Sequence, residues 1–162
     1  MASPSSPIIK KLSKNFLDHL KTIFDYEMDG ISRNRYKKKI SNYEIIDELV
    51  EKLTGRKKYL CELHYAKANS DDPVLSSFFP EMHIDDDGVL PGKVLTILFY
   101  IEKTCLGGNF IYETSETNDE KVAIVESGTV LIFKGNLKHR PQKIWGHGER
   151  KMISCSLKDN TR

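Results

Sequence analysis

Hydrophobic residues near the start of the chain recur at four-residue spacing, which places them on one face of an α-helix. This stripe consists of Ile8, Leu12, Phe16, Leu20 and Phe24. Ser6 and Pro7 stand directly before it, and proline is favoured at the first position of a helix. We therefore predict a first amphipathic helix that begins at Pro7 and ends near Gly30.

A second amphipathic helix is predicted after a basic link at residues 33–39. Ser41 and Glu44 have the spacing of a capping box, in which each side chain accepts a hydrogen bond from the backbone N–H of the other residue. Gly55 is a natural end, because glycine readily adopts the left-handed conformation that closes many helices. The apolar residues of this helix are Ile45, Ile46, Leu49, Val50 and Leu53.

From residue 58 onward the pattern changes to short apolar runs separated by turn residues. These runs cover residues 59–65, 94–101, 109–112, 122–125, 129–133 and 151–157, and a polar loop is expected at residues 66–80. Helices followed by many short strands favour a mainly β fold, a sandwich or barrel with a helical layer packed on it. We expect a single domain over residues 1–162, with a flexible leader (1–7), a helical support (8–57) and a β core (58–158).

The composition is typical of a globular protein, with 39% hydrophobic and 30% charged residues. The net charge of +2 argues neither for nor against a nucleic-acid partner. No apolar run approaches the roughly 20 residues of a membrane span, and the first residues lack the apolar core of a signal peptide. Three widely separated cysteines without a CxxC pair indicate reduced thiols rather than a disulfide framework or a zinc ribbon. We predict an intracellular, cytoplasmic protein without a membrane partner.

Two histidines and one aspartate form the candidate metal site. His83 and Asp85 are two residues apart, so on an extended strand they point to the same side. His139 follows the apolar run at residues 129–133, which places it at the mouth of a strand. Two imidazoles and one carboxylate can occupy one face of a non-haem iron and leave the other positions open for a co-substrate and O₂.

An arginine shortly after the second histidine adds a candidate anion site, and both assignments have competitors. Arg150 could hold a carboxylate through two parallel hydrogen bonds. Lys151 could serve instead, but adjacent strand residues face opposite sides, and the planar guanidinium fits a carboxylate better. Asp86 and Asp87 could replace Asp85 as the carboxylate ligand, although both have the character of turn residues.

Several ordered motifs together resemble those of the iron(II)/2-oxoglutarate-dependent dioxygenases, and within them the prolyl hydroxylase-like branch. The motifs are His83-Ile84-Asp85, residues 96–101, residues 107–110, residues 128–133, His139 and residues 148–150. The resemblance extends over about residues 59–157. It implies a double-stranded β-helix (jelly-roll) core with supporting helices, and it implies iron(II), 2-oxoglutarate and O₂, with ascorbate as reductant.

The resemblance also assigns roles to individual residues. It matches His83, Asp85 and His139 to the iron ligands. It matches four residues to the binding of 2-oxoglutarate: Arg150, Tyr100, Thr96 and Tyr65. In this comparison Arg150 pairs with the distal carboxylate, and the hydroxyl of Tyr100 reaches the same group.

The implied reaction is hydroxylation of an unactivated C–H bond, with a protein or peptide side chain such as proline favoured as substrate. A small-molecule or nucleic-acid oxygenase, an inactive jelly-roll binding module and a zinc hydrolase remain alternatives. The tail after Arg150 lacks the second arginine expected of nucleic-acid demethylases, which counts against a nucleobase. Phe78, Phe79 and Trp145 are candidates for the substrate entrance. The sequence does not indicate the oligomeric state.

Overall fold

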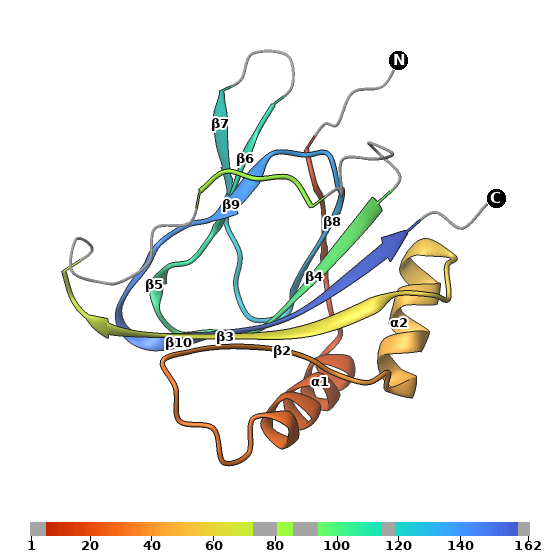
Figure 1. Cartoon of the computed structure of the whole chain (residues 1–162), viewed down its shortest axis with the longest axis horizontal. Helices are drawn as coiled ribbons and strands as arrows, with labels where there is room; N and C mark the ends of the chain where they lie inside the picture. Colours follow the sequence, from red (N-terminus) through yellow and green to blue (C-terminus); the bar gives the residue numbers. More distant parts are fainter. Residues whose placement is uncertain (1–5, 73–80, 86–93, 115–118, 159–162) are drawn as a thin grey trace.

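The computed structural model describes residues 6–72, 81–85, 94–114 and 119–158. It is a mainly β molecule in which two antiparallel sheets face each other and two helices cover the outer face of the larger sheet (Figure 1). Within these residues no helix is long and apolar enough to cross a lipid bilayer. The two facing antiparallel sheets with helices on one outer face confirm the predicted mainly β, jelly-roll class.

The N-terminal segment contributes strands to both edges of the larger sheet as well as the helices. Its elements are β1 (Ile8–Lys11), α1 (Lys14–Glu27), β2 (Arg35–Lys39) and α2 (Glu44–Thr54). The predicted start of the first helix is wrong. Residues 8–11 pair with strand β8 (Thr129–Lys134), and the helix begins only after Ser13. The Ser13 hydroxyl accepts a hydrogen bond from the backbone N–H of Phe16, which is the usual way to start a helix.

Two further predictions about this segment need correction. The basic link at 33–39 contains β2, which pairs antiparallel with strand β3 (Leu60–Ser70). The capping box is also wrong, since the residue that precedes the second helix is Tyr43 and no side chain caps that end. The predicted end is confirmed, because Gly55 closes α2 in the left-handed conformation with φ 75°.

The larger sheet has seven strands, and six of them lie in the order β1-β8-β4-β10-β3-β2. Besides β1 and β2, its strands are β3 (Leu60–Ser70), β4 (Val94–Lys103), β5 (Leu106–Gly107), β8 (Thr129–Lys134) and β10 (Ile144–Lys158). β5 pairs with β10 outside this path. β3 and β10 are longer than the apolar patterns predicted, because small and polar residues continue both strands along a shared eleven-residue register from Leu60 to Ser70.

The smaller sheet has the order β7-β6-β9 and lies across the larger one (Figure 1). Its strands are β6 (Phe110–Glu113), β7 (Glu120–Ala123) and β9 (His139–Pro141). His83 forms an isolated antiparallel bridge with His139. This bridge brings the predicted metal-binding segment to the edge of the smaller sheet.

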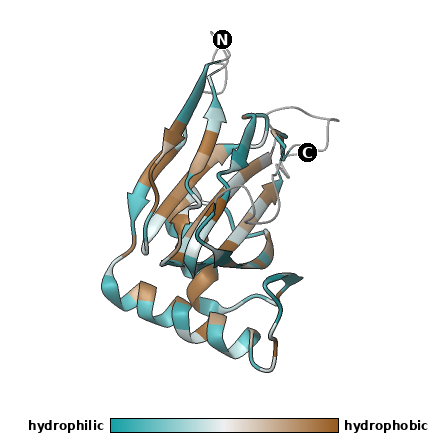
Figure 2. Cartoon of the chain, turned by 90° about the vertical axis from the view of Figure 1, so that its left-hand side faces the viewer, coloured by the Kyte–Doolittle hydropathy of each residue, from teal (hydrophilic) through white to brown (hydrophobic). Residues whose placement is uncertain are grey.

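Alternation along the strands divides the apolar residues between two packing layers. On β4, Ile97 and Phe99 pack toward the helices, while Leu98 and Tyr100 face the smaller sheet. Leu20 and Phe24 of α1 are fully buried against the first layer. Burial of each such side chain contributes about 1.5–3 kcal/mol, so these layers hold the two sheets and the helices in fixed positions. Figure 2 shows hydrophobic positions concentrated on the strands above the largely hydrophilic outer side of α1.

Candidate metal centre and adjoining cavity

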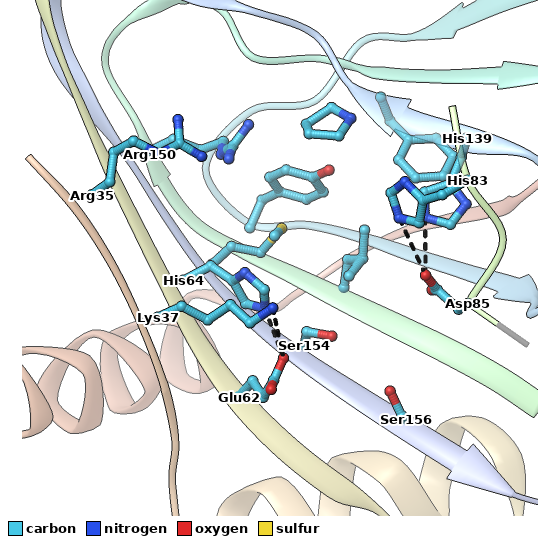
Figure 3. Close-up of a pocket in the computed structure, with 15 residues that line it drawn as sticks. Arg35, Lys37, Glu62, His64, His83, Asp85, His139, Arg150, Ser154 and Ser156 are labelled. Atoms are coloured by element: carbon cyan, nitrogen blue, oxygen red, sulfur yellow. Dashed lines mark ion pairs between the residues drawn. The ribbon is translucent and has the colours of Figure 1, made fainter. Parts of the chain in front are cut away.

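The predicted ligands His83, Asp85 and His139 lie together between the two sheets. Their candidate ligand atoms are all within 4.8 Å of one another. The Asp85 Oδ1 atom lies 3.5 Å from His83 Nε2 and 3.3 Å from His139 Nε2 (Figure 3). The sequence separates His139 from the other two by more than fifty residues, and the fold brings them to a common centre.

Backbone hydrogen bonds hold this arrangement. His83 and His139 each donate their backbone N–H to the carbonyl oxygen of the other, at 2.9 Å in both directions. The backbone N–H of Asp85 donates to the carbonyl of Gly135 at 2.9 Å. The short segment that carries the first two ligands is therefore held by hydrogen bonds to β9 at His83 and to the turn before β9 at Asp85.

The imidazole orientations also suit a metal ion. Nδ1 of His83 lies 3.0 Å from the carbonyl oxygen of Glu81, and Nδ1 of His139 lies 2.9 Å from that of Leu137. A carbonyl only accepts hydrogen bonds, so each Nδ1 carries a proton, and each Nε2 is the atom directed toward Asp85. Such outer hydrogen bonds fix the tautomer and the ring orientation of histidine ligands in metal sites.

Asp85 is held in its ionised form by its neighbours. Burial on its own raises the pKa of this carboxyl, but hydrogen bonding and charge from His139, a hydrogen bond from Thr96 and the charge of His83 outweigh it and lower the pKa. The Thr96 hydroxyl donates to Asp85 Oδ2 at 2.9 Å. Oδ1 is thereby left to face the two histidines. Two imidazoles and one carboxylate with open sides fit a non-haem iron(II).

Two phenylalanines form the inner wall behind His139. The Phe110 ring stacks on this imidazole with ring centroids 5.2 Å apart, and the Phe133 ring meets it edge-on at 4.8 Å. His139 is buried, whereas the side chain of His83 is half exposed. The centre is consequently closed on one side and accessible on the other.

A cavity of about 400 Å³ opens beside the metal ligands. Cavities of this size are typical of small-molecule and cofactor sites. It is lined by Arg35, Lys37, Glu62, His64, His83, Asp85, Leu98, Tyr100, Phe110, His139, Pro141, Arg150, Met152, Ser154 and Ser156. Figure 3 shows the metal ligands at one side of this space and two arginines at the other.

Arg150 lies at the end of the cavity away from the metal ligands (Figure 3). Only 8% of this residue is exposed, and its Nε has no hydrogen-bond partner among the described residues. Lys151 lies on the opposite face, where its Nζ is 3.0 Å from Glu102 Oε1. A buried guanidinium with unused donors is a site for an anion, because leaving such donors unpaired costs free energy.

The other residues matched to 2-oxoglutarate occupy different places. Tyr100 lines the cavity and is almost fully buried. Burial raises the pKa of Tyr100 to about 12, although the charge of Arg150 opposes this shift. The Tyr100 hydroxyl therefore keeps its proton. Thr96 hydrogen-bonds to Asp85 and so stands beside the metal ligands.

Tyr65 lies on the far side of the larger sheet. Its ring centroid is 6.5 Å from that of Phe24 of α1, and its hydroxyl donates to Glu149. It does not line the 400 Å³ cavity, which its neighbour His64 does. The physical reason is strand alternation, which turns consecutive residues of β3 to opposite faces. Tyr65 therefore faces away from the 400 Å³ cavity, although it contributes to the wall of a smaller adjoining cavity of about 210 Å³ that Arg35 and Arg150 also line.

The candidates for the substrate entrance receive little support from the structure. Phe78 and Phe79 lie outside the described residues. Trp145 packs its ring over Gly107, where an added Cβ would lie 2.4 Å from the ring. Trp145 is not among the residues that line the cavity.

Among the polar residues of the cavity wall that were not predicted from the sequence, four come from the long neighbouring strands β3 and β10. Glu62 and His64 come from β3, and Ser154 and Ser156 come from β10. Each pair is separated by two positions, so each pair shares one face of its strand. This two-residue spacing is visible in the sequence. It could have identified these residues as part of the cavity wall only if both strands were already known to pass beside the metal ligands.

His64 is a partly buried histidine that is neutral at neutral pH. Desolvation lowers the pKa of His64 to about 4, although the charge of Glu62 acts in the opposite direction. Its Nε2 lies 3.4 Å from Glu62 Oε1 but has no hydrogen-bond partner within the described part of the chain. At neutral pH this imidazole is therefore an uncharged polar group in the cavity wall.

The low pKa of His64 predicts a loss of stability in acid. Between pH 6.5 and 4 the unfolded chain binds a proton at His64 that the folded protein does not, so stability falls as the pH decreases through this window. The shift from 6.5 to about 4 corresponds to at most about 3 kcal/mol. We expect His64→Gln to flatten the pH dependence of the unfolding free energy, measured by urea denaturation of metal-free protein. Substitution of the exposed His19 by Gln is the matched control, and an unchanged slope in His64→Gln would contradict this explanation.

No protein-family model and no curated protein matches the sequence. Solved structures do match over nearly the whole chain. A Pseudomonas putida prolyl-4-hydroxylase aligns with 96% of this chain and 94% of its own at a TM-score of 0.69 and 12% identity. The fold is that of the 2-oxoglutarate oxygenases.

Two further matches carry ligands. A prolyl hydroxylase from Trichoplax adhaerens, in complex with a hypoxia inducible factor oxygen degradation domain peptide fragment, has a TM-score of 0.67 at 15% identity and 96% and 84% coverage of the two chains. HygX from Streptomyces hygroscopicus, with nickel and 2-oxoglutarate bound, has a TM-score of 0.65 at 11% identity and 97% and 84% coverage. These structures share the fold of this chain, whose described residues include the His-Asp-His cluster.

Proposed function

We propose that the chain is an iron(II)- and 2-oxoglutarate-dependent dioxygenase that hydroxylates an unactivated C–H bond. One observation carries this proposal: His83, Asp85 and His139 converge within 4.8 Å in the same cavity as the buried guanidinium of Arg150. The histidines and the aspartate would hold iron(II) on one face. When bound, the iron and 2-oxoglutarate would supply the oxidising chemistry with O₂, and ascorbate would keep the metal reduced.

The protein's own residues would position and shield the reactants. Arg150 would hold the distal carboxylate of 2-oxoglutarate through its guanidinium, and Tyr100 would offer its protonated hydroxyl to the same group. Leu98 and Phe110 would exclude water from the space between the metal and this anchor. Thr96 would keep Asp85 turned toward the metal.

A protein or peptide side chain, in the manner of the prolyl hydroxylases, is our preferred substrate. The peptide complex of the Trichoplax enzyme supports a peptide substrate, and the half-exposed side chain of His83 leaves the metal centre accessible to one. A small-molecule substrate on the same core is the second candidate, supported by the similar fold of SnoK, a non-heme alpha ketoglutarate dependent carbocyclase from nogalamycin biosynthesis. A zinc hydrolase could use the same three ligands, but the buried Arg150 and Tyr100 would then have no role.

The activity can be tested before the substrate is known. Purified protein supplied with iron(II), ascorbate and 2-oxoglutarate should form succinate slowly, as measured by NMR. Extracts incubated with the protein should contain a peptide or metabolite whose mass rises by one oxygen atom. Absence of both succinate formation and 2-oxoglutarate binding would refute the proposal. Binding without any turnover would favour the binding module.

Replacement of Arg150 by Gln should weaken the binding of 2-oxoglutarate. The guanidinium would form charge-assisted hydrogen bonds with the distal carboxylate, which are worth about 1.5–3 kcal/mol each. We therefore expect the Kd to rise by about 100-fold, while iron(II) binding stays within about twofold. Anaerobic titration of the visible charge-transfer band measures the first, and calorimetry measures the second. An unchanged Kd for 2-oxoglutarate would rule out this anchor.

A further inference from the structure

A second arginine belongs to the anion end of the cavity. We propose that Arg35 of β2 and Arg150 of β10 together clamp the distal carboxylate of the co-substrate, so that Arg35 is a specificity-determining residue for dicarboxylic 2-oxo acids. This inference rests on the proposed function. It adds to that proposal a residue from the N-terminal segment, outside the motifs that carry the resemblance.

Strand pairing places the two arginines on the same face of the larger sheet. Ala66 of β3 is the register partner of Arg150 on one side and of Arg35 on the other. Directly paired residues on antiparallel strands point to the same face. The two Cα atoms are therefore two strand spacings apart, about 10 Å, and both side chains leave the sheet on the cavity side.

The residue between the arginines leaves room for them to approach each other. Ala66 is buried and has the smallest side chain of those pointing into this part of the cavity. Both arginines line the 400 Å³ cavity, and both also line a smaller adjoining one of about 210 Å³. Figure 3 shows both arginine side chains at the same end of the cavity, opposite Asp85.

Electrostatics favours a shared anion at this position. Partial burial lowers the pKa of Arg35, and the positive charge of Arg150 lowers it further. The two guanidinium groups thus repel each other in the absence of an anion. A carboxylate between them would replace this repulsion by two attractions, and guanidinium forks match carboxylate geometry well.

The charges of the wall agree with this assignment. The charged side chains known to line the cavity are Arg35, Lys37, Arg150, Glu62 and Asp85, so cations outnumber anions among them. Glu62 lies near Lys37, with 4.0 Å between Oε1 and Nζ, and Asp85 faces the metal ligands. The acidic residue next to Arg150, Glu149, is engaged on the other face by Tyr65. Arg35 and Arg150 thus bring two guanidinium groups to the end of the cavity where the carboxylate would lie.

The test compares two 2-oxo acids that differ in one group. 2-Oxoglutarate and 2-oxopentanoate have the same five-carbon chain, but the second lacks the distal carboxylate. With anaerobic iron(II)-loaded protein, calorimetry should show that Arg35→Gln raises the Kd for 2-oxoglutarate by about 10-fold and leaves that for 2-oxopentanoate within about twofold. In the Arg35→Gln/Arg150→Gln double variant the two effects should not multiply, because both residues act on one carboxylate.

Lys39→Gln is the matched control, because Lys39 is an exposed cation on the same face of the same strand and is not among the residues that line the cavity. It should change the Kd for 2-oxoglutarate by less than about twofold. Arg35→Lys should retain only part of the affinity, since lysine keeps the charge but loses the planar fork. Thermal unfolding of each variant checks that β2 remains folded.

The possible results separate this inference from the proposed function. A wild-type Kd in Arg35→Gln, with weakened binding in Arg150→Gln, would overturn the clamp and leave the proposed function intact. Equal losses in Arg35→Gln and Lys39→Gln would mean that Arg35 acts only through its positive charge, and this result would overturn the clamp as well. Failure of the wild-type protein to bind 2-oxoglutarate would overturn both. A second readout is hydrogen exchange, because 2-oxoglutarate should slow the exchange of β2 amides in the wild type but not in Arg35→Gln.

Discussion

Asp85→Ala should abolish iron(II) binding at micromolar concentrations and, with it, succinate formation. Asp85 is the only carboxylate among the three converging side chains, so its removal takes away one ligand and the negative charge that offsets the metal. Loss of a residue that merely hydrogen-bonds to a metal ligand costs about 10–100-fold in affinity, and loss of the ligand itself should exceed that. Calorimetric titration with iron(II) under anaerobic conditions measures the effect.

Thr96→Val provides the comparison for this result. Valine has nearly the same shape as threonine but cannot donate the 2.9 Å hydrogen bond to Asp85 Oδ2. We expect iron(II) binding to weaken by about 10-fold in Thr96→Val, between the wild type and Asp85→Ala. If Asp85→Ala bound iron(II) as tightly as the wild type, the metal would have to lie elsewhere, and the site assigned here would be wrong.

The three candidate metal ligands could be predicted from the sequence for two reasons. Two of them are close together in the chain, and the third follows a recognisable apolar strand. His83 and Asp85 are two residues apart, and this spacing alone places them on one side of an extended segment. His139 follows a strongly apolar strand, which indicated a position near the end of the core. What spacing could not predict is the pairing of His83 with His139 backbone to backbone, because a β-bridge depends on the whole fold.

The N-terminal elements show where local pattern fails. Ile8 and Leu12 fit a helical stripe, yet residues 8–11 form an edge strand on β8, because pairing with an existing strand outweighs a weak helical preference. The basic residues 33–39 have no apolar alternation that would signal a strand. They form β2 because β3 offers a free edge. Without β2, the position of Arg35 next to Arg150 could not be foreseen.

Strand alternation explains why Arg150 points into the 400 Å³ cavity, as predicted, and why Tyr65 does not. For Arg150 and Lys151 the choice was between two adjacent residues, and side-chain chemistry favoured the one that the structure places in the cavity. For Tyr65 the resemblance suggested an inward tyrosine, but the register of β3 turns it toward α1 and brings His64 inward instead. A one-residue difference in register reverses which residues face the site, and the sequence alone does not fix that register.

Gly107→Ala should destabilise the fold more than Gly55→Ala. Gly107 has φ 69°, and an added Cβ would lie 2.1 Å from the carbonyl oxygen of Lys143 and 2.4 Å from the ring of Trp145. The left-handed conformation costs a non-glycine residue roughly 1–2 kcal/mol. The contact with a backbone oxygen adds to this cost, because β5 and β10 are paired at this point and neither can move alone. We expect a total loss above about 3 kcal/mol in the unfolding free energy, measured by urea denaturation.

Gly55→Ala separates conformational strain from the steric clash. Gly55 has nearly the same backbone angle, φ 75°, but no atom lies within 4 Å of the position of an added Cβ. Its substitution should therefore cost only the strain, about 1–2 kcal/mol. Because Gly108, the next residue, has its Cβ position 3.6 Å from Cδ of Arg150, displacement of β5 in Gly107→Ala should also weaken 2-oxoglutarate binding, which Gly55→Ala should not. Equal stability losses in the two variants would mean that β5 does not approach β10 as closely in solution, and Arg150 would then lose the wall that holds it in the cavity.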